Sequence, residues 1–348
     1  MQRVYDAIKL HFPGRKVRSV TSLARDSVTG ANVVHVILNK TNGDRRAIVV
    51  KVGTPDRIAK EVRGYELLKP YFGTSIPDLL HVGNDYIIIQ FVREVKATFK
   101  ELAFDPDHHG IPAEQFWGMY QNVLAVKREN WLQTVQEGGQ SENSIIRLEM
   151  SETIVALSNV FGNEIQCPII IRNKEYPSLQ SCIDIIVEFL KQDLPWTVLA
   201  HGDLKGENIL VYKVRRGNRW GVKIIDLEWA GRIDWCEALM RVGKYCSSKT
   251  SMVDSTPRFE RDHGVVTLYY QVRHKEMCRK MQLGARRFGT EFNATVLQGK
   301  DPDWEKRFDY YLAASFLREI VLLQRRNLPP SLLVPLWGEI VKLVAKHS

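Results

Sequence analysis

Residues 200–228 of this 348-residue chain combine two carboxylates and an amide with two apolar runs, in AHGDLKGENILVYKVRRGNRWGVKIIDLE. Asp203 follows a His-Gly pair, Asn208 precedes the first apolar run, and Asp226 ends the second. The polar turn between the runs predicts a β-hairpin, which returns Asp226 to the side of Asn208. Phosphoryl transfer from a nucleotide needs one carboxylate to deprotonate the attacking hydroxyl, and an amide and a second carboxylate to hold magnesium on the phosphates. The spacing therefore predicts Asp203 as the catalytic base and Asn208 and Asp226 as metal ligands.

A second pair of charged residues lies upstream of this stretch. Lys51 interrupts the apolar run AIVVKV, and a lysine buried in a strand is costly unless an anion pairs with it. The helix predicted over residues 55–68 carries Glu61, and a lysine on the third strand with a glutamate on the next helix is the ion pair that positions nucleotide phosphates in kinases. Two alternatives stay open: Glu66 as the partner on the same helix, and an edge lysine whose ammonium simply reaches solvent.

The elements that must position these residues fall into a strand-rich first quarter, a helical middle, one hairpin and further helices. Periodicity and turn signals predict strands over residues 17–23, 32–38, 47–52, 79–82 and 86–92. Helices are predicted over residues 4–12, 55–68, 115–134, 145–161, 178–191, 235–244, 258–283, 304–326 and 331–346, with an irregular stretch or short hairpin in 163–177. This order predicts an α+β fold with two lobes: a small antiparallel sheet in residues 1–92 and a large helical lobe in 93–348.

Composition indicates an ordinary soluble protein, with 44% apolar and 26% charged residues. No apolar run approaches the roughly 20 residues of a membrane span, and the first residues do not read as a signal peptide. The five cysteines are widely spaced and form no CxxC pair, which argues against a zinc site or a disulfide framework. We therefore expect reduced thiols, a cytoplasmic location and no membrane partner.

The formal charge of +9 is unevenly spread along the chain. Residues 241–348 hold 19 Lys and Arg against 11 Asp and Glu, a net of +8. This excess is either a solvated basic surface or a preference for an anionic partner or substrate. A nucleic-acid partner is not expected, because no recognised nucleic-acid-binding module is present.

The motifs around Asp203 and Asp226 resemble the aminoglycoside phosphotransferase and choline kinase superfamily, which has a protein-kinase-like fold. That family carries HGD-L-x-x-x-N-I-L followed by I-D-x-E, and AHGDLKGENIL and IIDLE match both patterns. Upstream, Gly30-Ala31-Asn32 matches a Gly-x-Asn pattern before the second strand, and Glu61 with Leu67 matches a helix signature. The resemblance covers residues 28–92 and 196–235, and its central part is the more specific.

The resemblance implies a kinase that uses ATP and Mg²⁺ and transfers phosphate to an alcohol group. It supports the roles given above to Asp203 as base and to Asn208 and Asp226 as metal ligands, and it favours Glu61 over Glu66 as the partner of Lys51. It also implies that His201 supports the catalytic loop by hydrogen bonding. Glu228 occupies the family's I-D-x-E acid.

Three further positions of the nucleotide site follow from the same resemblance. Gly30 lies in the loop that would cover the phosphates, although that loop has no GxGxxG pattern and holds one glycine, with Ser27 and Thr29 beside it. Gln90 and Val92 fall where a kinase chain crosses between lobes and offers backbone groups to adenine.

Two features of the sequence bear on the choice between a small-molecule and a protein acceptor. The sequence after Asp226 is LEWAGRIDW, with neither DFG nor APE, so a regulated activation loop is not indicated. Lys205 stands two residues after the base, where protein kinases carry a lysine that touches the transferred phosphate. We therefore expect a small-molecule acceptor, with a protein-directed kinase and a nucleotide-binding regulatory module with little catalysis as the alternatives.

The basic last third disfavours a polycationic aminoglycoside and favours a neutral or anionic acceptor, such as a sugar or an amino-acid-like metabolite. The acceptor itself, the choice between ATP and GTP, and the oligomeric state stay open at this point.

Overall fold

The computed structural model describes most of the chain in residue ranges separated by short gaps. The described residues are 1–23, 32–39, 44–93, 95–104, 110–141, 144–214, 219–243, 251–253, 257–274, 276–325 and 333–348. The predicted site residue Gly30, with Ser27 and Thr29, lies outside them.

The chain forms two compact units, residues 1–102 with 199–231 and residues 103–198 with 232–348. The hairpin that carries Asp226 therefore groups with the N-terminal sheet. The lobe boundary placed after residue 92 stays a prediction.

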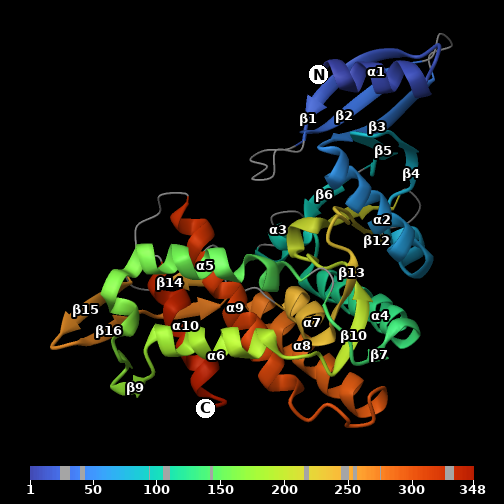
Figure 1. Cartoon of the computed structure of the whole chain (residues 1–348). Helices are drawn as coiled ribbons and strands as arrows, with labels where there is room; N and C mark the ends of the chain where they lie inside the picture. Colours follow the sequence, from blue (N-terminus) through green and yellow to red (C-terminus); the bar gives the residue numbers. More distant parts are fainter. Residues whose placement is uncertain are drawn as a thin grey trace. The chain divides into compact units, whose positions relative to one another are not determined.

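A five-stranded antiparallel sheet, in the order β1-β2-β3-β5-β4, forms the body of the first unit (Figure 1). The strands are β1 (Lys16–Ser22), β2 (Asn32–Asn39), β3 (Arg45–Val52), β4 (Leu79–Val82) and β5 (Tyr86–Gln90). Helix α1 (Gln2–His11) covers one face, where its Val4 and Ile8 join Val36 and Val50 in a fully buried cluster. Because side chains alternate along a strand, Lys51 lies on the opposite face from Val50, and α1 does not cover that face.

Helix α2 (Pro55–Phe72) follows β3 directly and begins with proline, whose fixed φ suits the first helical position. A second, three-stranded sheet completes the unit in the order β12-β11-β6. Its strands are β6 (Val95–Thr98), β11 (Ile209–Lys213) and β12 (Trp220–Ile224), and the short helix α3 (Phe99–Phe104) follows β6. The β11–β12 pair is the predicted hairpin, with Ile209 opposite Ile224.

The second unit is largely helical. Its helices are α4 (Ala113–Thr134), α5 (Ile145–Phe161), α6 (Leu179–Lys191), α7 (Trp235–Gly243), α8 (Glu276–Thr295), α9 (Trp304–Gln324) and α10 (Val334–Ala345). Ser144 and Ser178 cap α5 and α6, each accepting a hydrogen bond from a backbone N–H of the first turn. Trp131, Trp235 and Phe292 pack together in the core. None of the described helices combines the length and the apolar character needed to cross a membrane.

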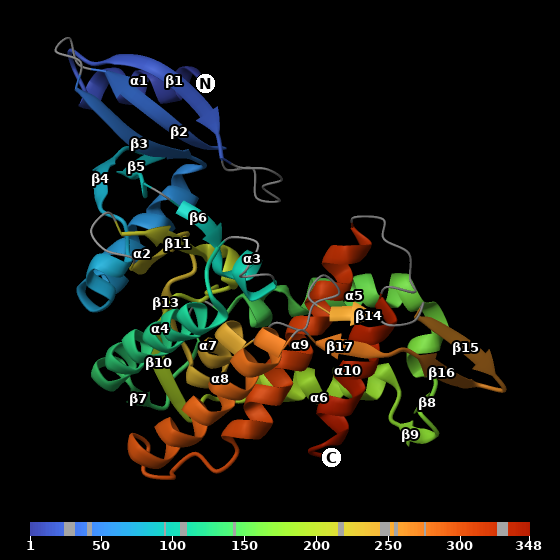
Figure 2. The same cartoon turned by 180° about the vertical axis from the view of Figure 1, so that it is seen from behind.

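Strands of three small sheets accompany these helices. They are β7 (Gln136–Glu137), β10 (Trp196–Ala200) and β13 (Gly231–Asp234), in the order β13-β10-β7; β14 (Ser251–Val253) with β17 (Val272–His274); and β8 (Ile169–Ile171), β9 (Lys174–Tyr176), β15 (Arg258–Asp262) and β16 (Val265–Tyr269), in the order β15-β16-β8-β9. Figure 2 shows the last four beside one another. The β8–β9 pair is the short hairpin predicted within residues 163–177.

The predicted α+β fold, with an antiparallel N-terminal sheet and a largely helical remainder, is confirmed. The helix predicted over residues 258–283 is wrong over residues 258–274, which hold β15, β16 and β17, and α8 begins at Glu276. His263 and Gly264 both have positive φ and turn the chain between β15 and β16. Strand β16 then pairs in parallel with β8, a contact across about a hundred residues that local periodicity does not encode.

Candidate active site

Lys51 lies between two carboxylates that come from different elements. Its Nζ is 2.7 Å from Oε2 of Glu61 on α2 and 2.6 Å from Oδ1 of Asp226, which follows β12. Glu61 is buried, with 2% of its side chain exposed, whereas 35% of the Asp226 side chain is exposed. The sequence-based choice of Glu61 agrees with this pairing, because Glu66 is exposed on α2. The structure therefore joins three of the predicted residues in one ion-paired cluster.

Burial and charge act in opposite directions on this cluster. Burial alone would lower the pKa of Lys51, but Glu61 and Asp226 raise it above the ordinary lysine value. Burial raises the pKa of Glu61, and Lys51 opposes that change by favouring the carboxylate. Lys51 is thus held as an ammonium at neutral pH.

The loop between β10 and β11 holds Asp203, Lys205 and Asn208 in a network of short-range bonds. Nζ of Lys205 lies 2.7 Å from Oδ2 of Asp203, and Nδ2 of Asn208 donates to the Asp203 carbonyl oxygen at 2.9 Å. Asp203 and Asn208 are buried, whereas 46% of the Lys205 side chain is exposed. The loop turns at Gly202, where φ is +75° and a Cβ would overlap the Trp229 carbonyl oxygen, so only glycine fits.

His201 connects this loop to the strand that leads to Asp226. Its Nδ1 accepts a hydrogen bond from the Asp203 backbone N–H at 3.3 Å, so Nε2 carries the proton and donates to the Ile225 carbonyl oxygen at 2.9 Å. A further bond runs from the Ile225 N–H to the Asn208 carbonyl oxygen at 3.0 Å. These bonds are the loop support predicted for His201, and they fix Asp203, Asn208 and Asp226 to one scaffold.

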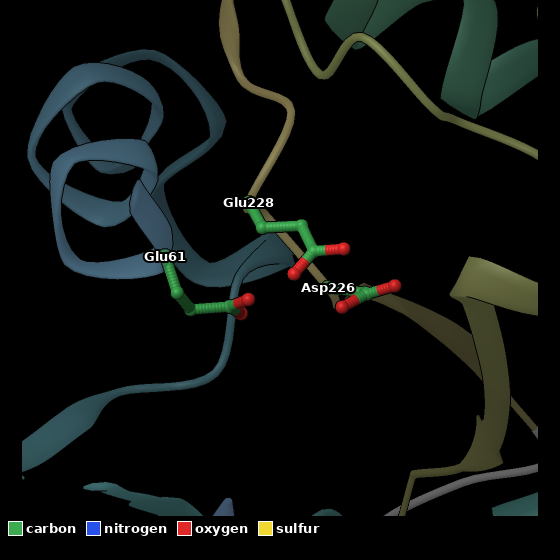
Figure 3. A group of neighbouring side chains, drawn as sticks. All are labelled: Glu61, Asp226 and Glu228. Atoms are coloured by element: carbon green, nitrogen blue, oxygen red, sulfur yellow. The ribbon is translucent and has the colours of Figure 1, made fainter. Parts of the chain in front are cut away.

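Asp226 itself has a positive φ of 66°. Non-glycine residues adopt this conformation rarely, and they do so mainly at turns and functional sites. The turn ends β12 and directs the carboxylate of Asp226 toward Glu61 and Glu228, as Figure 3 shows.

Solved structures of small-molecule kinases match the chain over nearly its whole length. Choline kinase LicA from Streptococcus pneumoniae matches with a TM-score of 0.53 at 10% identity, covering 99% of both chains. The chain has the fold of the aminoglycoside phosphotransferase and choline kinase-like superfamily. A putative fructosamine-3-kinase from Thermobifida fusca matches with a TM-score of 0.51 at 14% identity, covering 98% of this chain and 99% of that one. A macrolide 2'-phosphotransferase type I matches with a TM-score of 0.52 at 12% identity, covering 98% and 96%.

Sequence comparisons give no comparable signal. No protein-family model matches the chain, and no curated protein matches it either. Membership of this kinase-like fold therefore rests on the structure, and on the motifs that resemble the superfamily.

Gln90 and Val92 lie where a chain of this kinase-like fold leaves its N-terminal sheet. With Ala47 and Tyr212 they line a cavity of about 630 Å³, and Phe91 between them stacks on His35 with ring centroids 4.0 Å apart. The Gln90 N–H already donates to the Asp78 carbonyl oxygen at 2.9 Å, so this donor is engaged within the sheet. The role of Gln90 and Val92 in holding a nucleotide base stays a prediction.

One feature of the site was missed by sequence reasoning, namely the partner of Glu228. Nη2 of Arg57 on α2 lies 2.8 Å from both carboxylate oxygens of Glu228, and Nε1 of Trp229 donates to Oε1 at 3.1 Å. Arg57 precedes Glu61 by four residues, which places both on one face of the helix. That spacing was the available signal.

The residues present fit a divalent cation of the magnesium type, which takes oxygen ligands. Oxygen atoms of Glu61, Asp226 and Glu228 lie within 4.8 Å of one another (Figure 3). Asn208 already uses Nδ2 toward Asp203, which leaves its amide oxygen as the chemically suitable ligand atom. A carboxylate and an amide oxygen, completed by phosphates and water, are an ordinary magnesium environment.

Proposed function

We propose that this protein transfers the γ-phosphate of ATP to a hydroxyl group of a small molecule. The observation that carries the proposal is the Lys51 ammonium held at 2.7 Å from Glu61 and 2.6 Å from Asp226, in the same unit as the bonded Asp203–Asn208 loop. Phosphoryl transfer depends on positioning and charge stabilisation, and these residues provide both.

Asp203 is assigned as the residue that orients the acceptor hydroxyl and receives its proton. Buried and bonded to Lys205, its carboxylate is held in one orientation, and His201 fixes the backbone at the same residue. Lys205 is half-exposed, so its ammonium is free to reach an incoming phosphate once substrates enter. In this assignment Lys205 passes from Asp203 to the transferred phosphate and neutralises charge that develops there.

Asn208 and Asp226 are assigned to hold the metal, and Lys51 to hold the phosphates. Bound Mg²⁺ would bridge phosphate oxygens and neutralise their charge. Amicoumacin kinase hAmiN, which matches with a TM-score of 0.50 at 14% identity, has been solved with AMP-PNP and Ca²⁺, and LicA with AMP. These neighbours support ATP and a divalent ion as the co-substrate and metal of this chain.

A small molecule is the favoured acceptor, because the fold neighbours named for their substrates act on small molecules. The net charge of +8 in residues 241–348 favours a neutral or anionic acceptor over a polycation. A protein acceptor is the second candidate, and the observation in its favour is Lys205, which stands two residues after the base and pairs with it.

The test is ATP consumption by the purified chain with Mg²⁺, across a panel of sugars, amino alcohols, hydroxy acids and aminoglycosides. Asp203→Ala should lower kcat by about 10²–10⁴ for the best acceptor while the protein stays folded. Glu207→Ala, an exposed change in the same loop, is the matched control and should stay near wild-type activity. Wild-type turnover in Asp203→Ala would sink the assignment, and labelling of a protein substrate alone would favour the second candidate.

A further inference from the structure

One face of α2 packs along the segment that follows β12. Arg57, Glu61 and Gly64 are spaced at i, i+4 and i+7, so they form a single stripe down the helix. Each of them contacts the chain between Leu227 and Glu228. The stripe therefore meets the two residues that directly follow the predicted metal ligand Asp226.

Around Glu61 and Gly64, α2 lies close to the segment that follows β12. Oε1 of Glu61 accepts the Leu227 backbone N–H at 3.1 Å, while its other oxygen binds Lys51. One turn further on, a Cβ at Gly64 would overlap the Leu227 carbonyl oxygen. Glycine at this position lets the helix backbone approach the segment closely.

At the Arg57 end of the contact, one guanidinium nitrogen faces both oxygens of a carboxylate in an ion pair. Both oxygens of Glu228 lie 2.8 Å from Nη2 of Arg57, and Glu228 is only 7% exposed at its side chain. Trp229 adds a bond to the same carboxylate, and Nζ of Lys60 lies 6.0 Å from the centre of the Trp229 ring. A buried carboxylate with these partners has one preferred position.

Arg57 offsets part of the negative charge of three neighbouring carboxylates. The carboxylates of Glu61, Asp226 and Glu228 lie within 4.8 Å of one another, and Lys51 and Arg57 are the cations bonded to them among the described residues. Without Arg57, one ammonium would face three carboxylates, two of them buried. Repulsion would then move Glu228, and with it the backbone that places Asp226.

The geometry points to Arg57 as a positioning residue for phosphoryl transfer: through Glu228 it fixes α2 against residues 226–229 and so keeps Lys51, Glu61 and Asp226 in register. This inference rests on the proposed function, because the effect of Arg57 is measured as a change in the kcat of phosphoryl transfer. Arg57 touches neither nucleotide nor metal in this assignment. It acts through the helix that carries Glu61.

The test compares Arg57→Ala with Arg63→Ala, the same chemical change at an exposed position of α2. Arg57→Ala should lower kcat by about 10–100-fold, while the Kd for Mg·AMP-PNP changes by about threefold or less, because alignment rather than binding is lost. Guanidinium ion at millimolar concentration should restore part of the lost kcat. The kcat of the double variant Arg57→Ala/Glu228→Gln should be no lower than that of the less active single variant.

Three results would overturn the inference: kcat of Arg57→Ala within about twofold of wild type, an equal loss in Arg63→Ala, or additive effects in the double variant. A wild-type chain without phosphotransfer to any acceptor would instead reject the proposed function. In that case hydrogen exchange still tests whether Arg57 holds α2 in place. Arg57→Ala should speed exchange at the backbone amides of Glu61 to Gly64 and of Leu227. Unchanged exchange at those amides would show that Arg57 does not fix α2 against residues 226–229.

Discussion

Two buried charge clusters, one in each compact unit, have the same composition of one cation and two carboxylates. In the first unit Lys51 pairs with Glu61 and Asp226. In the second, Arg307 of α9 pairs with Asp234 and Asp301. The two clusters differ in how completely their polar atoms are used.

In the Arg307 cluster every carboxylate oxygen has a hydrogen-bond partner. Arg307 donates four hydrogen bonds of 2.6–3.2 Å to the two carboxylates, and no member exposes more than 8% of its side chain. The remaining capacity of the carboxylates is met by Trp235 Nε1 at 2.8 Å and by the Cys236 backbone N–H at 2.8 Å. Such a cluster ties α9 to β13, and its carboxylate oxygens are all engaged within the protein.

The Lys51 cluster is left partly open. Asp226 keeps 35% of its side chain exposed and adopts a positive φ, and a third carboxylate, Glu228, lies nearby. Charge in this cluster is unbalanced toward the negative, which suits a divalent cation. We infer that a structural ion cluster differs from a functional one in how completely its polar atoms are hydrogen-bonded. The number of cations and carboxylates does not distinguish the two.

The largest effect that separates the two clusters is expected at Asp226. Asp226→Asn should lower kcat by about 10³-fold or more, because the charge that holds the metal is lost. Its free energy of unfolding should change by about 1 kcal/mol or less, since Lys51 and Glu61 remain paired. Turnover assays and denaturant titration of the same preparations measure both. A strong loss of stability would show that Asp226 is structural, like Asp234.

The opposite result is expected for the closed cluster. Arg307→Met leaves two buried carboxylates without their cation and should destabilise the second unit by about 3–5 kcal/mol. Denaturant titration gives the value, and Arg325→Met at the exposed end of α9 is the matched control. A stable Arg307→Met variant that had lost nucleotide binding would contradict the structural role of this cluster.

The sequence predicted the Lys51–Glu61 pair of the open cluster but not the Lys51–Asp226 pair, and the roles given to these residues stay predictions. The HGD-x₄-N and I-D patterns predict Asn208 and Asp226 at the two ends of a hairpin with Asp203 in the loop before it, and a lysine in an apolar strand demands a carboxylate. The choice of Glu61 over Glu66 needed the family resemblance, since both lie on one predicted helix. Their burial separates them: Glu61 is 2% exposed, and Glu66 lies on the exposed side.

The closed cluster could not be predicted, because Asp234 is far along the chain from Asp301 and Arg307. Asp234 ends β13 and Arg307 lies 73 residues later, and neither belongs to a recognisable motif. The Arg57–Glu228 pair, 171 residues apart, was missed for the same reason. Similarly, residues 258–269 form β15 and β16, and β16 pairs with the distant strand β8. The local sequence pattern had predicted a helix there.

A third buried cation, Lys127 of α4, differs from Lys51 and Arg307 because the hydrogen bond described for its ammonium is to a carbonyl oxygen. Nζ donates to the Ala238 carbonyl oxygen at 3.1 Å and lies 5.2 Å from the centre of the Trp131 ring. Burial lowers the pKa of Lys127 to about 7, whereas Glu61 and Asp226 hold the pKa of Lys51 high despite burial. A carboxylate partner is thus what keeps a buried lysine charged.

The lowered pKa predicts a pH dependence of stability. Between about pH 7 and pH 10 the unfolded chain binds a proton at this lysine that the folded chain does not, so stability rises with pH. From about pH 7 to pH 9 the gain should be on the order of 2 kcal/mol, and it should vanish in Lys127→Met. Unfolding midpoints across this range measure it, with Lys191→Met, an exposed change, as control. Equal pH profiles for wild type and Lys127→Met would show that Lys127 stays charged.

Calorimetric titration of the purified chain with AMP-PNP tests the assignment of the open cluster without knowledge of the acceptor. We predict Mg²⁺-dependent binding to the wild type, weaker by about tenfold or more in Asp226→Asn and in Lys51→Met. Lys191→Met should bind as the wild type does. Binding that is absent from the wild type, or unchanged in Asp226→Asn and independent of Mg²⁺, would contradict the assignment of Lys51, Glu61 and Asp226 as the phosphate and metal site.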